Sequence, residues 1–285
     1  MKKRVTCNLE PLQNRIREEV SPEPTSFFKA FSVICPIIIY YVVSQLIILL
    51  FAYFIQWVSG QDGVFLQVAE WLRANSMAVS GVVKGLSLVI GVAAVFILFL
   101  KETPEIKMPP QQKKDIGILF FLGASAALAV NILFSLLGFT GSSASYEQVA
   151  EKQFAFPLWA GVLLYGIVSP FAEEIVFRGI VYNRMRRQYS LWTALIGSSL
   201  LFGLYHGNVV QAVYGFLLGL LIAVLYEKYG SILVPVLLHG AANIAVYVVT
   251  SDSKLAVLCM NWIGCLISTF VFIGLFMLCL SKKTE

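Results

Sequence analysis

Long apolar runs without charged residues are the feature that most restricts how this chain can fold. A helix rises 1.5 Å per residue, so roughly 20 apolar residues are needed to cross the hydrocarbon core of a bilayer, which is about 30 Å thick. We therefore expect an all-α polytopic membrane protein with about eight transmembrane helices, of which the fifth is short. The eight segments that reach the required length or come close to it are 27–58, 78–100, 116–139, 155–180, 190–206, 208–226, 231–250 and 255–281.

The composition agrees with this fold class. Only 13% of the 285 residues are charged and 58% are hydrophobic, whereas about 25% of a soluble domain is charged. With a cytoplasmic N-terminus, sixteen Lys and Arg fall on the inner side and three, Arg73, Lys152 and Lys254, on the outer side. Positive residues favour the cytoplasmic side. The distribution therefore predicts a multi-pass protein of the cell membrane with both termini in the cytoplasm.

The apolar segments divide the chain into four parts. Residues 1–26 form a polar tail that mixes basic and acidic residues, as a solvated cytoplasmic tail does and a nucleic-acid-binding arm does not. Residues 27–139 hold the first three transmembrane helices. Residues 155–250 hold four helices and are the predicted catalytic core, and residues 251–285 hold the last transmembrane helix and a short C-terminal tail.

Ionisable residues are rare inside the apolar segments and are concentrated in one part of the chain. Of sixteen acidic residues, only Glu173 and Glu174 lie inside a predicted helix, and both histidines of the chain lie in or at the ends of apolar helices. A charge at the bilayer centre costs at least about 2.5–3.5 kcal/mol on insertion scales, so such residues generally mark a functional cavity or an ion pathway. The intramembrane ionisable residues are Lys84, Glu173, Glu174, Arg178, His206 and His239.

Helical spacing separates the two glutamates. Successive residues are rotated by about 100° around an α-helix, so Glu173 and Glu174 face different directions. Glu174 and Arg178 are spaced i, i+4 and can form an ion pair. Glu173 is then free to face another element. Pro170 removes a backbone donor just upstream and is expected to kink the helix beside Glu173.

A carboxylate, two imidazoles and an amide from three helices have two chemical uses. Phe202 with His206, and His239 with Asn243, are spaced i, i+4 on their own helices. Glu173, His206 and His239 could hold a zinc ion with one position open for water. Alternatively, Glu173 and one histidine activate water, while Asn243 and the other histidine donate hydrogen bonds to the developing oxyanion. Both alternatives predict hydrolysis of an acyl bond inside the membrane.

Three short motifs then resemble a known family. "EEIVFR" fits EExxxR, "FGLYH" fits FxxxH and "HGAAN" fits HxxxN, in this order and with both histidines of the chain. This ordered triple resembles the CPBP family of CAAX prenyl proteases and bacteriocin-processing enzymes, also called Abi-type, over residues 155–250. The resemblance implies an eight-helix intramembrane endopeptidase with its catalytic cavity inside the membrane. The short loops are similar to those of bacterial members.

Carried over motif by motif, the resemblance implies a role for each residue. Glu173 would be the general base for water, assisted by His206, and His239 with Asn243 would stabilise the oxyanion. The supporting residues would be Glu174, Arg178 and Phe202. The CAAX members of the family are usually described as metal-free, so we expect no cofactor, with zinc held by Glu173, His206 and His239 as the alternative.

The predicted partners are the lipid bilayer and a peptide or a prenylated or otherwise lipidated protein, with no nucleic acid among them. Nothing in the sequence specifies the cleaved peptide. An alternative function is a proteolytically inactive membrane scaffold that regulates a partner membrane protein. A third, a proton- or ion-coupled transporter, is disfavoured by the absence of internal sequence repeats.

The predicted segment boundaries impose one geometric requirement. His206 lies about 24 Å along its helix from Ser190, whereas His239 lies only about 12 Å along its helix from Ser231. Both helices are expected to start on the same side of the membrane. The two histidines therefore share a level only if helices tilt, the fourth helix kinks, or one boundary lies several residues from its predicted position.

Overall fold

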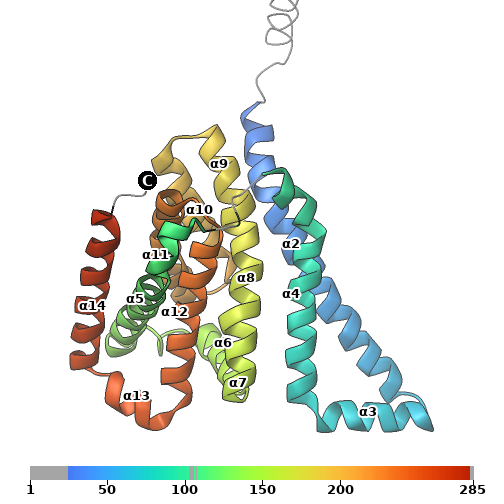
Figure 1. Cartoon of the computed structure of the whole chain (residues 1–285). Coiled ribbons are helices and arrows are strands. Elements are labelled where there is room, and N and C mark those ends of the chain that lie inside the picture. The colour runs from blue at the N-terminus through green and yellow to red at the C-terminus, as the bar shows by residue number, and fades with distance from the viewer. Residues whose placement is uncertain (1–24, 103–105, 107, 283–285) are drawn as a thin grey trace, which may run out of the picture.

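The computed structural model describes residues 25–102, 106 and 108–282, and the regular structure of these residues is helical, with no β-strand. The predicted N-terminal tail falls almost entirely outside them, as do residues 283–285. Figure 1 shows the arrangement. The helices are α2 (Ser26–Ser59), α3 (Val64–Ala74), α4 (Ser76–Lys101), η1 (Pro110–Asp115), α5 (Ile116–Leu136), α6 (Ala144–Phe154), α7 (Leu158–Gly161), η2 (Val162–Val168), α8 (Ser169–Glu174), η3 (Ile175–Tyr182), α9 (Asn183–Gln188), α10 (Leu191–Tyr205), α11 (Val209–Tyr229), α12 (Leu233–Ser251), α13 (Ser253–Cys259) and α14 (Trp262–Ser281).

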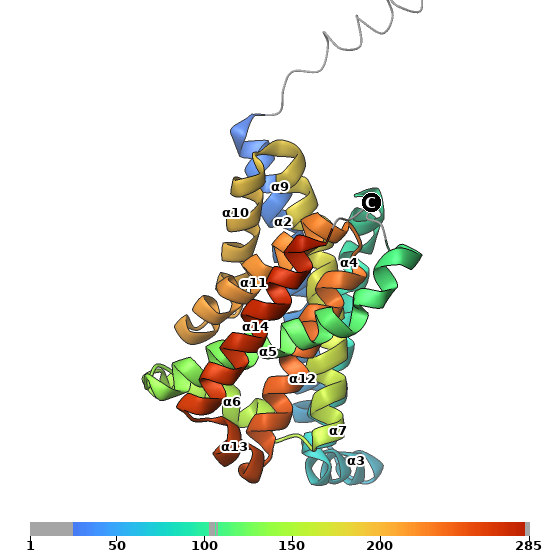
Figure 2. The same cartoon turned by 60° about the vertical axis from the view of Figure 1, so that its left-hand side comes forward.

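Seven helical stretches of the described chain are long and apolar enough to cross a membrane, and α10 is an eighth apolar helix of only 15 residues. These eight correspond in order to the eight predicted segments, including the short fifth one. The all-α polytopic fold is therefore confirmed, and the chain is a multi-pass membrane protein. Three short helices, α3, α6 and α13, lie between the spans. In Figure 2, α14 comes forward over α5, the helix on which it packs.

The helix that carries the glutamates runs from Leu158 to Gln188 and comprises α7, η2, α8, η3 and α9. Both η2 and η3 are π-helical, which means that their backbone bonds run from residue i to residue i+5. The α-helical turn α8 between them begins with Ser169 and Pro170 and ends with the two glutamates. The disturbance predicted at Pro170 therefore takes the form of π-helical turns on both sides of the glutamates.

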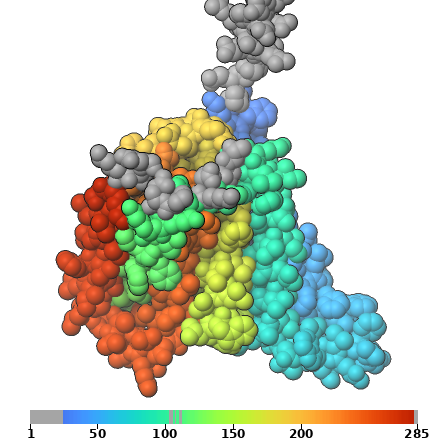
Figure 3. Space-filling view, viewed as in Figure 1, coloured from blue at the N-terminus to red at the C-terminus, as the bar shows by residue number. Residues whose placement is uncertain are grey.

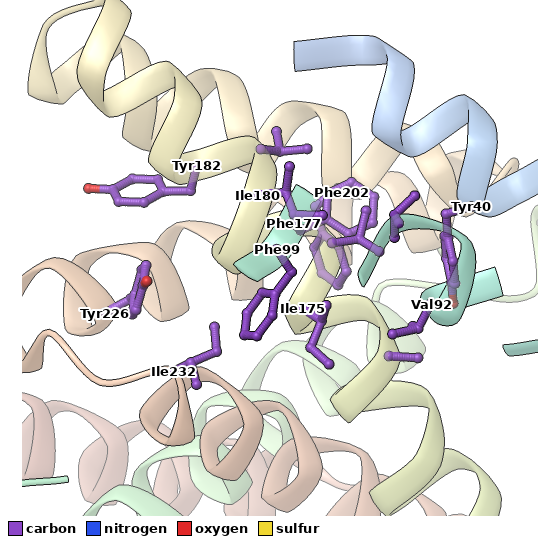
Figure 4. Packing of buried hydrophobic residues seen from close by; sticks show 14 of the residues in the cluster. Tyr40, Val92, Phe99, Ile175, Phe177, Ile180, Tyr182, Phe202, Tyr226 and Ile232 are labelled. Carbon is purple, nitrogen blue, oxygen red and sulfur yellow. The ribbon is translucent and has the colours of Figure 1, made fainter. Parts of the chain in front are cut away.

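Glycines allow the helices around this turn to approach closely. A side chain at Gly203 of α10 would collide with the backbone of Ala212 on α11, and one at Gly179 of η3 would lie 2.5 Å from the ring of Phe99 on α4. Aromatic and branched residues from α2, α4, η3 and α10 fill the remaining space, as Figure 4 shows for Phe177 and Phe202. The centre of the molecule is thus densely packed around the π-helical segment η3.

The first two membrane-spanning helices form a separate arm. Helices α2 and α4 pack on each other and are joined by α3 at one end. They contact the rest of the protein mainly through η3, α8 and η2, and in Figure 3 they form the right-hand side of the molecule. Half of the residues of α2 are exposed, and its large exposed side chains are apolar, as expected for a helix that faces lipid.

Candidate active site

A cavity of about 470 Å³ opens inside the helix bundle, with walls from α2, α4, α5, α6, α8, α10, α11 and α12. It brings together residues that are as much as 70 positions apart in the sequence and that come from three different motifs. The predicted site residues on its wall are Glu173, Phe202, His206, His239 and Asn243. Glu174 and Arg178 are completely buried behind this wall.

The Glu173 carboxylate is buried but has no strong cationic partner. Only 7% of the residue is exposed. The Ser169 hydroxyl, four residues earlier, donates to its Oε1 at 2.5 Å, and His239 Nε2 lies 3.8 Å from its Oε2. Within the described chain, no Lys or Arg forms an ion pair with it. One carboxylate oxygen is therefore held in place, and the other faces an imidazole across a gap too long for a direct hydrogen bond.

The neighbouring Glu174 is paired through one oxygen, whereas its Oε2 is buried without a hydrogen-bond partner. Its Oε1 accepts from Arg178 Nη1 at 2.9 Å and lies 2.7 Å from His239 Nδ1. Arg178 also donates to the backbone carbonyl of Gly219 on α11 at 3.0 Å. The ion pair predicted from the i, i+4 spacing is therefore present, and the structure adds a contact that the sequence does not reveal. Glu174 also fixes the orientation of His239.

The aromatic ring of Phe202 organises both imidazoles. Its centroid lies 5.0 Å from that of His206 and 5.4 Å from that of His239, both in edge-to-face geometry. The Arg178 guanidinium lies over the same ring at 4.6 Å, a favourable cation–π position. The Phe202 carbonyl oxygen is 2.9 Å from His206 Nδ1. Because a carbonyl can only accept, the hydrogen sits on Nδ1, and the Nε2 of a neutral His206 carries the lone pair.

Asn243 is positioned by a carbonyl that the glutamate helix leaves free. Pro170 has no N–H to donate to a carbonyl in the preceding turn, and in a π-helical turn that carbonyl belongs to residue i−5, Tyr165. Asn243 Nδ2 donates to the Tyr165 oxygen at 2.9 Å. An amide nitrogen carries two hydrogens, so the Asn243 side chain retains one for another acceptor.

The two histidines lie at one level in the structure. The mismatch predicted from the sequence comes from a misplaced helix boundary. The fourth membrane helix was expected to end at 180 but continues to Gln188, about 12 Å further at 1.5 Å per residue. This extension accounts for the mismatch of about 12 Å between the predicted levels. The sequence suggests a loop at the polar residues 183–188, but they are helical, and Arg184 and Arg187 both bind the carboxylate of Glu102, which directly follows α4.

Three contributors to the site were missed from the sequence. Ser169 carries a recognisable signal, since it stands four residues before Glu173 on the same helix. The carbonyl groups of Tyr165 and Gly219 carry none, because each bonds a side chain from a distant helix.

The zinc alternative requires three ligands to converge. Among the described residues, no group of three His, Cys, Asp or Glu side chains is arranged to hold a metal ion. Glu173, His206 and His239 line one cavity but do not form such a group. The residues present therefore do not fit a zinc site as arranged, and no step below involves a metal.

Comparison with known proteins finds a family model that matches this region. Residues 155–245 match the family model described as Type II CAAX prenyl endopeptidase Rce1-like. All three motifs and the whole predicted site lie inside the matched stretch. No solved structure matches the chain.

Two curated bacterial proteins are similar to the chain. A putative membrane peptidase YdiL from Bacillus subtilis is 26% identical over 162 residues, which cover 54% of this chain and 66% of the relative. An uncharacterized 24.3 kDa protein from Escherichia coli is 33% identical over 141 residues, which cover 46% of this chain and 64% of the relative. The chain thus spans slightly less than two thirds of each relative. Residues 155–245 are therefore similar to the Rce1-like type II CAAX prenyl endopeptidase family, which confirms the CAAX protease resemblance drawn from the three motifs.

Proposed function

We propose that this protein is an intramembrane endopeptidase that hydrolyses a peptide bond of a membrane-associated or lipid-modified peptide with a water molecule activated by Glu173. The observation that carries this proposal is the contrast at one helical turn. Glu174 is neutralised by Arg178 at 2.9 Å, whereas Glu173 lines the cavity with one oxygen unbonded and an imidazole 3.8 Å away. A buried carboxylate in this setting is suited to accept a proton from water.

In the proposed reaction, Glu173 Oε2 takes a proton from a water molecule and the water oxygen bonds to the carbonyl carbon of the peptide. Ser169 holds the other carboxylate oxygen and so fixes the direction of the base. The lone pair on His206 Nε2 provides a second acceptor for the same water. This division of labour agrees with the tautomer that the Phe202 carbonyl imposes on His206.

His239 and Asn243 are the proposed donors to the oxyanion. An imidazolium at His239 donates through Nε2–H, and Glu174 at Nδ1 supplies the countercharge for that form. The free hydrogen of the Asn243 amide supplies the second donor. The proton held by Glu173 then passes to the leaving amine as the C–N bond breaks, and a carboxyl group and an amine result.

The proposed substrate is a peptide that reaches the cavity from the membrane. Exposed apolar side chains cover α2, α4 and α14, so the bilayer surrounds the bundle. Peptides held in the membrane by a lipid group or by their own apolar residues have direct access to such a protein. Maturation of bacteriocin-like peptides belongs to the same proposal.

The test uses purified protein in phosphatidylcholine vesicles and two fluorescence-quenched peptides, one S-farnesylated near its C-terminus and one apolar leader peptide. Glu173→Gln should lower kcat/KM by about 10³-fold or more, since loss of a general base alone costs about 10²–10⁴-fold. Glu70→Gln, which removes an exposed carboxylate of α3, is the matched control and should leave cleavage unchanged. Wild-type activity in folded Glu173→Gln protein would overturn the role of Glu173 as the base. Absence of cleavage by the folded wild-type protein would favour a scaffold.

Removal of metal tests the cofactor part of the proposal. We expect cleavage to persist after dialysis against EDTA and in the presence of 1,10-phenanthroline, because Glu173 and the histidines act on water directly. Elemental analysis of the purified protein measures its zinc content in parallel. Activity lost with chelator and restored by zinc would contradict a metal-free mechanism while leaving the peptidase assignment in place.

A further inference from the structure

Lys84 lies on the buried face of α4. It precedes Leu88, a core residue that is 2% exposed, by four positions, so the two side chains share one helical face. The neighbouring Gly81 and Gly85 bring this face against the start of the glutamate helix, since side chains there would contact Phe156 and Leu164. A lysine thus occupies a position where the packing face of a membrane helix would ordinarily carry an apolar residue.

The Lys84 side chain lines the same cavity as Glu173 and interacts with it electrostatically. It forms no direct ion pair: within the part of the chain that the structure describes, no carboxylate oxygen lies within 4 Å of its ammonium group. A cation in a membrane interior without a paired anion is costly and generally serves a function. The reaction proposed above makes no use of it.

The charges on the cavity wall are unbalanced. Glu173 is the only carboxylate among the described lining residues, whereas two lysines, Lys84 and Lys152, line the same space. Glu174 does not offset them, because it lies behind the wall and is already paired with Arg178. Even without any charge on the histidines, the wall therefore carries an excess of positive charge, which favours an anionic group in the bound ligand.

We propose that Lys84 is a specificity residue that binds a carboxylate of the peptide substrate inside the cavity. This inference rests on the proposed peptidase function and adds the chemical class of the substrate. The carboxylate is either the free C-terminus of the peptide or an Asp or Glu side chain close to the cleaved bond. A partly buried ammonium group binds such an anion more strongly than one at the surface, because water screens it less.

Three forms of one peptide separate the two sources of the carboxylate. The probe is an S-farnesylated, fluorescence-quenched peptide made as the C-terminal acid, as the C-terminal amide, and as the amide with Asp as its last residue. Wild-type protein should cleave the acid with a kcat/KM about 10- to 100-fold above that of the plain amide, the range expected for one charge-assisted hydrogen bond. Recovery with the Asp-containing amide identifies the side-chain source, and no recovery identifies the C-terminus.

The variant Lys84→Met keeps the length of the side chain and removes its charge. It should bring the ratio between acid and amide close to one, by slowing cleavage of the acid alone. Lys84→Arg should keep much of the preference. Lys152→Met is the matched control: it removes a cation from the exposed rim of the cavity, where water screens the charge, and should keep the wild-type ratio.

Two outcomes overturn the inference. Equal slowing of all peptides by Lys84→Met would mean that Lys84 serves only as a countercharge for Glu173. Equal cleavage of all three peptides by the wild-type protein would mean that no carboxylate is recognised. Binding of the same peptides to Glu173→Gln protein, followed by fluorescence anisotropy, separates this inference from the peptidase proposal. If the wild-type protein cleaves nothing but prefers carboxylate peptides through Lys84, the inference about Lys84 is supported and the peptidase proposal is refuted.

Discussion

The helix from Leu158 to Gln188 carries two groups of glutamate–arginine contacts, and they differ in one respect. At its end, Arg184 and Arg187 bind the two oxygens of Glu102, the residue that follows α4, so each charged side chain of that group contacts an opposite charge. In the interior, Arg178 and His239 share one oxygen of Glu174, while the adjacent Glu173 is left without an arginine.

The difference indicates which residues of a buried polar cluster hold helices together and which are available for catalysis. Glu102 joins α4 to α9 and has its two oxygens occupied, which suits a structural link between the arm and the bundle. Glu174 also joins different helices, but one of the groups that it binds is the His239 imidazole on the cavity wall. Glu173 links only to a serine on its own helix. Unused bonding capacity beside a cavity, rather than charge or burial alone, therefore marks the candidate base.

Loss of the Glu174 charge should have the largest combined effect. Glu174→Gln leaves the fully buried Arg178 without its anion, and breaking a buried ion pair typically costs about 3–5 kcal/mol. We expect a loss of that size in the free energy of unfolding in detergent and, because His239 loses its anchor, near-complete loss of cleavage. Both are measured on the same preparation, by denaturant titration and by peptide cleavage.

Glu102→Gln is the corresponding change in the group formed by Glu102, Arg184 and Arg187. It should also destabilise the protein, since two arginines lose a shared partner, but the fraction that remains folded should keep its kcat/KM. If Glu174→Gln fails to fold, Arg178→Lys is the substitute: it keeps the charge and removes the second donor of the guanidinium, which bonds to the Gly219 carbonyl. Equal loss of kcat/KM in folded Glu102→Gln and folded Arg178→Lys would erase the distinction between the two clusters.

The close approach of α11 to the interior cluster gives the next largest effect. A methyl group at Gly219 would lie 3.1 Å from both Arg178 Nη2 and Phe202 Cδ1, so Gly219→Ala forces the guanidinium and the ring apart. Overpacking of this kind costs about 1–3 kcal/mol. Gly274→Ala on α14 is the control, because nothing lies within 4 Å of the added methyl group. A Gly219→Ala protein as stable and active as wild type would show that the cluster tolerates displacement of Arg178.

The hydroxyl that holds Glu173 should affect activity more than stability. Ser169→Ala removes the donor at 2.5 Å from Oε1, and we expect kcat to fall about tenfold, a typical worth for a hydrogen bond to a charged group. Ser199→Ala is the matched control, since its buried hydroxyl bonds only to the Leu195 carbonyl of its own helix. A fall in kcat of the same size in both variants would assign the effect to general loosening of the bundle.

The sequence predicts the interactions within one helix and misses those between helices. Local spacing predicts the Glu174–Arg178 pair, the separation of Glu173 from it and the eight apolar segments. It does so because the helical repeat determines which side chains of one helix face the same direction. The partners of Arg178, His239 and Asn243 on other helices lie 41, 65 and 78 residues away. These contacts depend on depth and tilt, which turn on the exact end of the fourth membrane helix, and local spacing does not determine them.

The smallest effect is expected for an exposed ion pair of α9, Arg186 with Glu227. Arg186 Nε lies 2.9 Å from Glu227 Oε1, but the two side chains are 43% and 33% exposed, and Glu227 keeps the Tyr182 hydroxyl as a donor at 2.6 Å. Exposed pairs contribute little because water and salt screen them. Arg186→Gln should therefore leave both the thermal midpoint and kcat/KM unchanged, at low and at high salt. A clear loss of stability confined to low salt would show that the pair couples α9 to α11, and pairing at this end of the helix would then matter even where it is exposed.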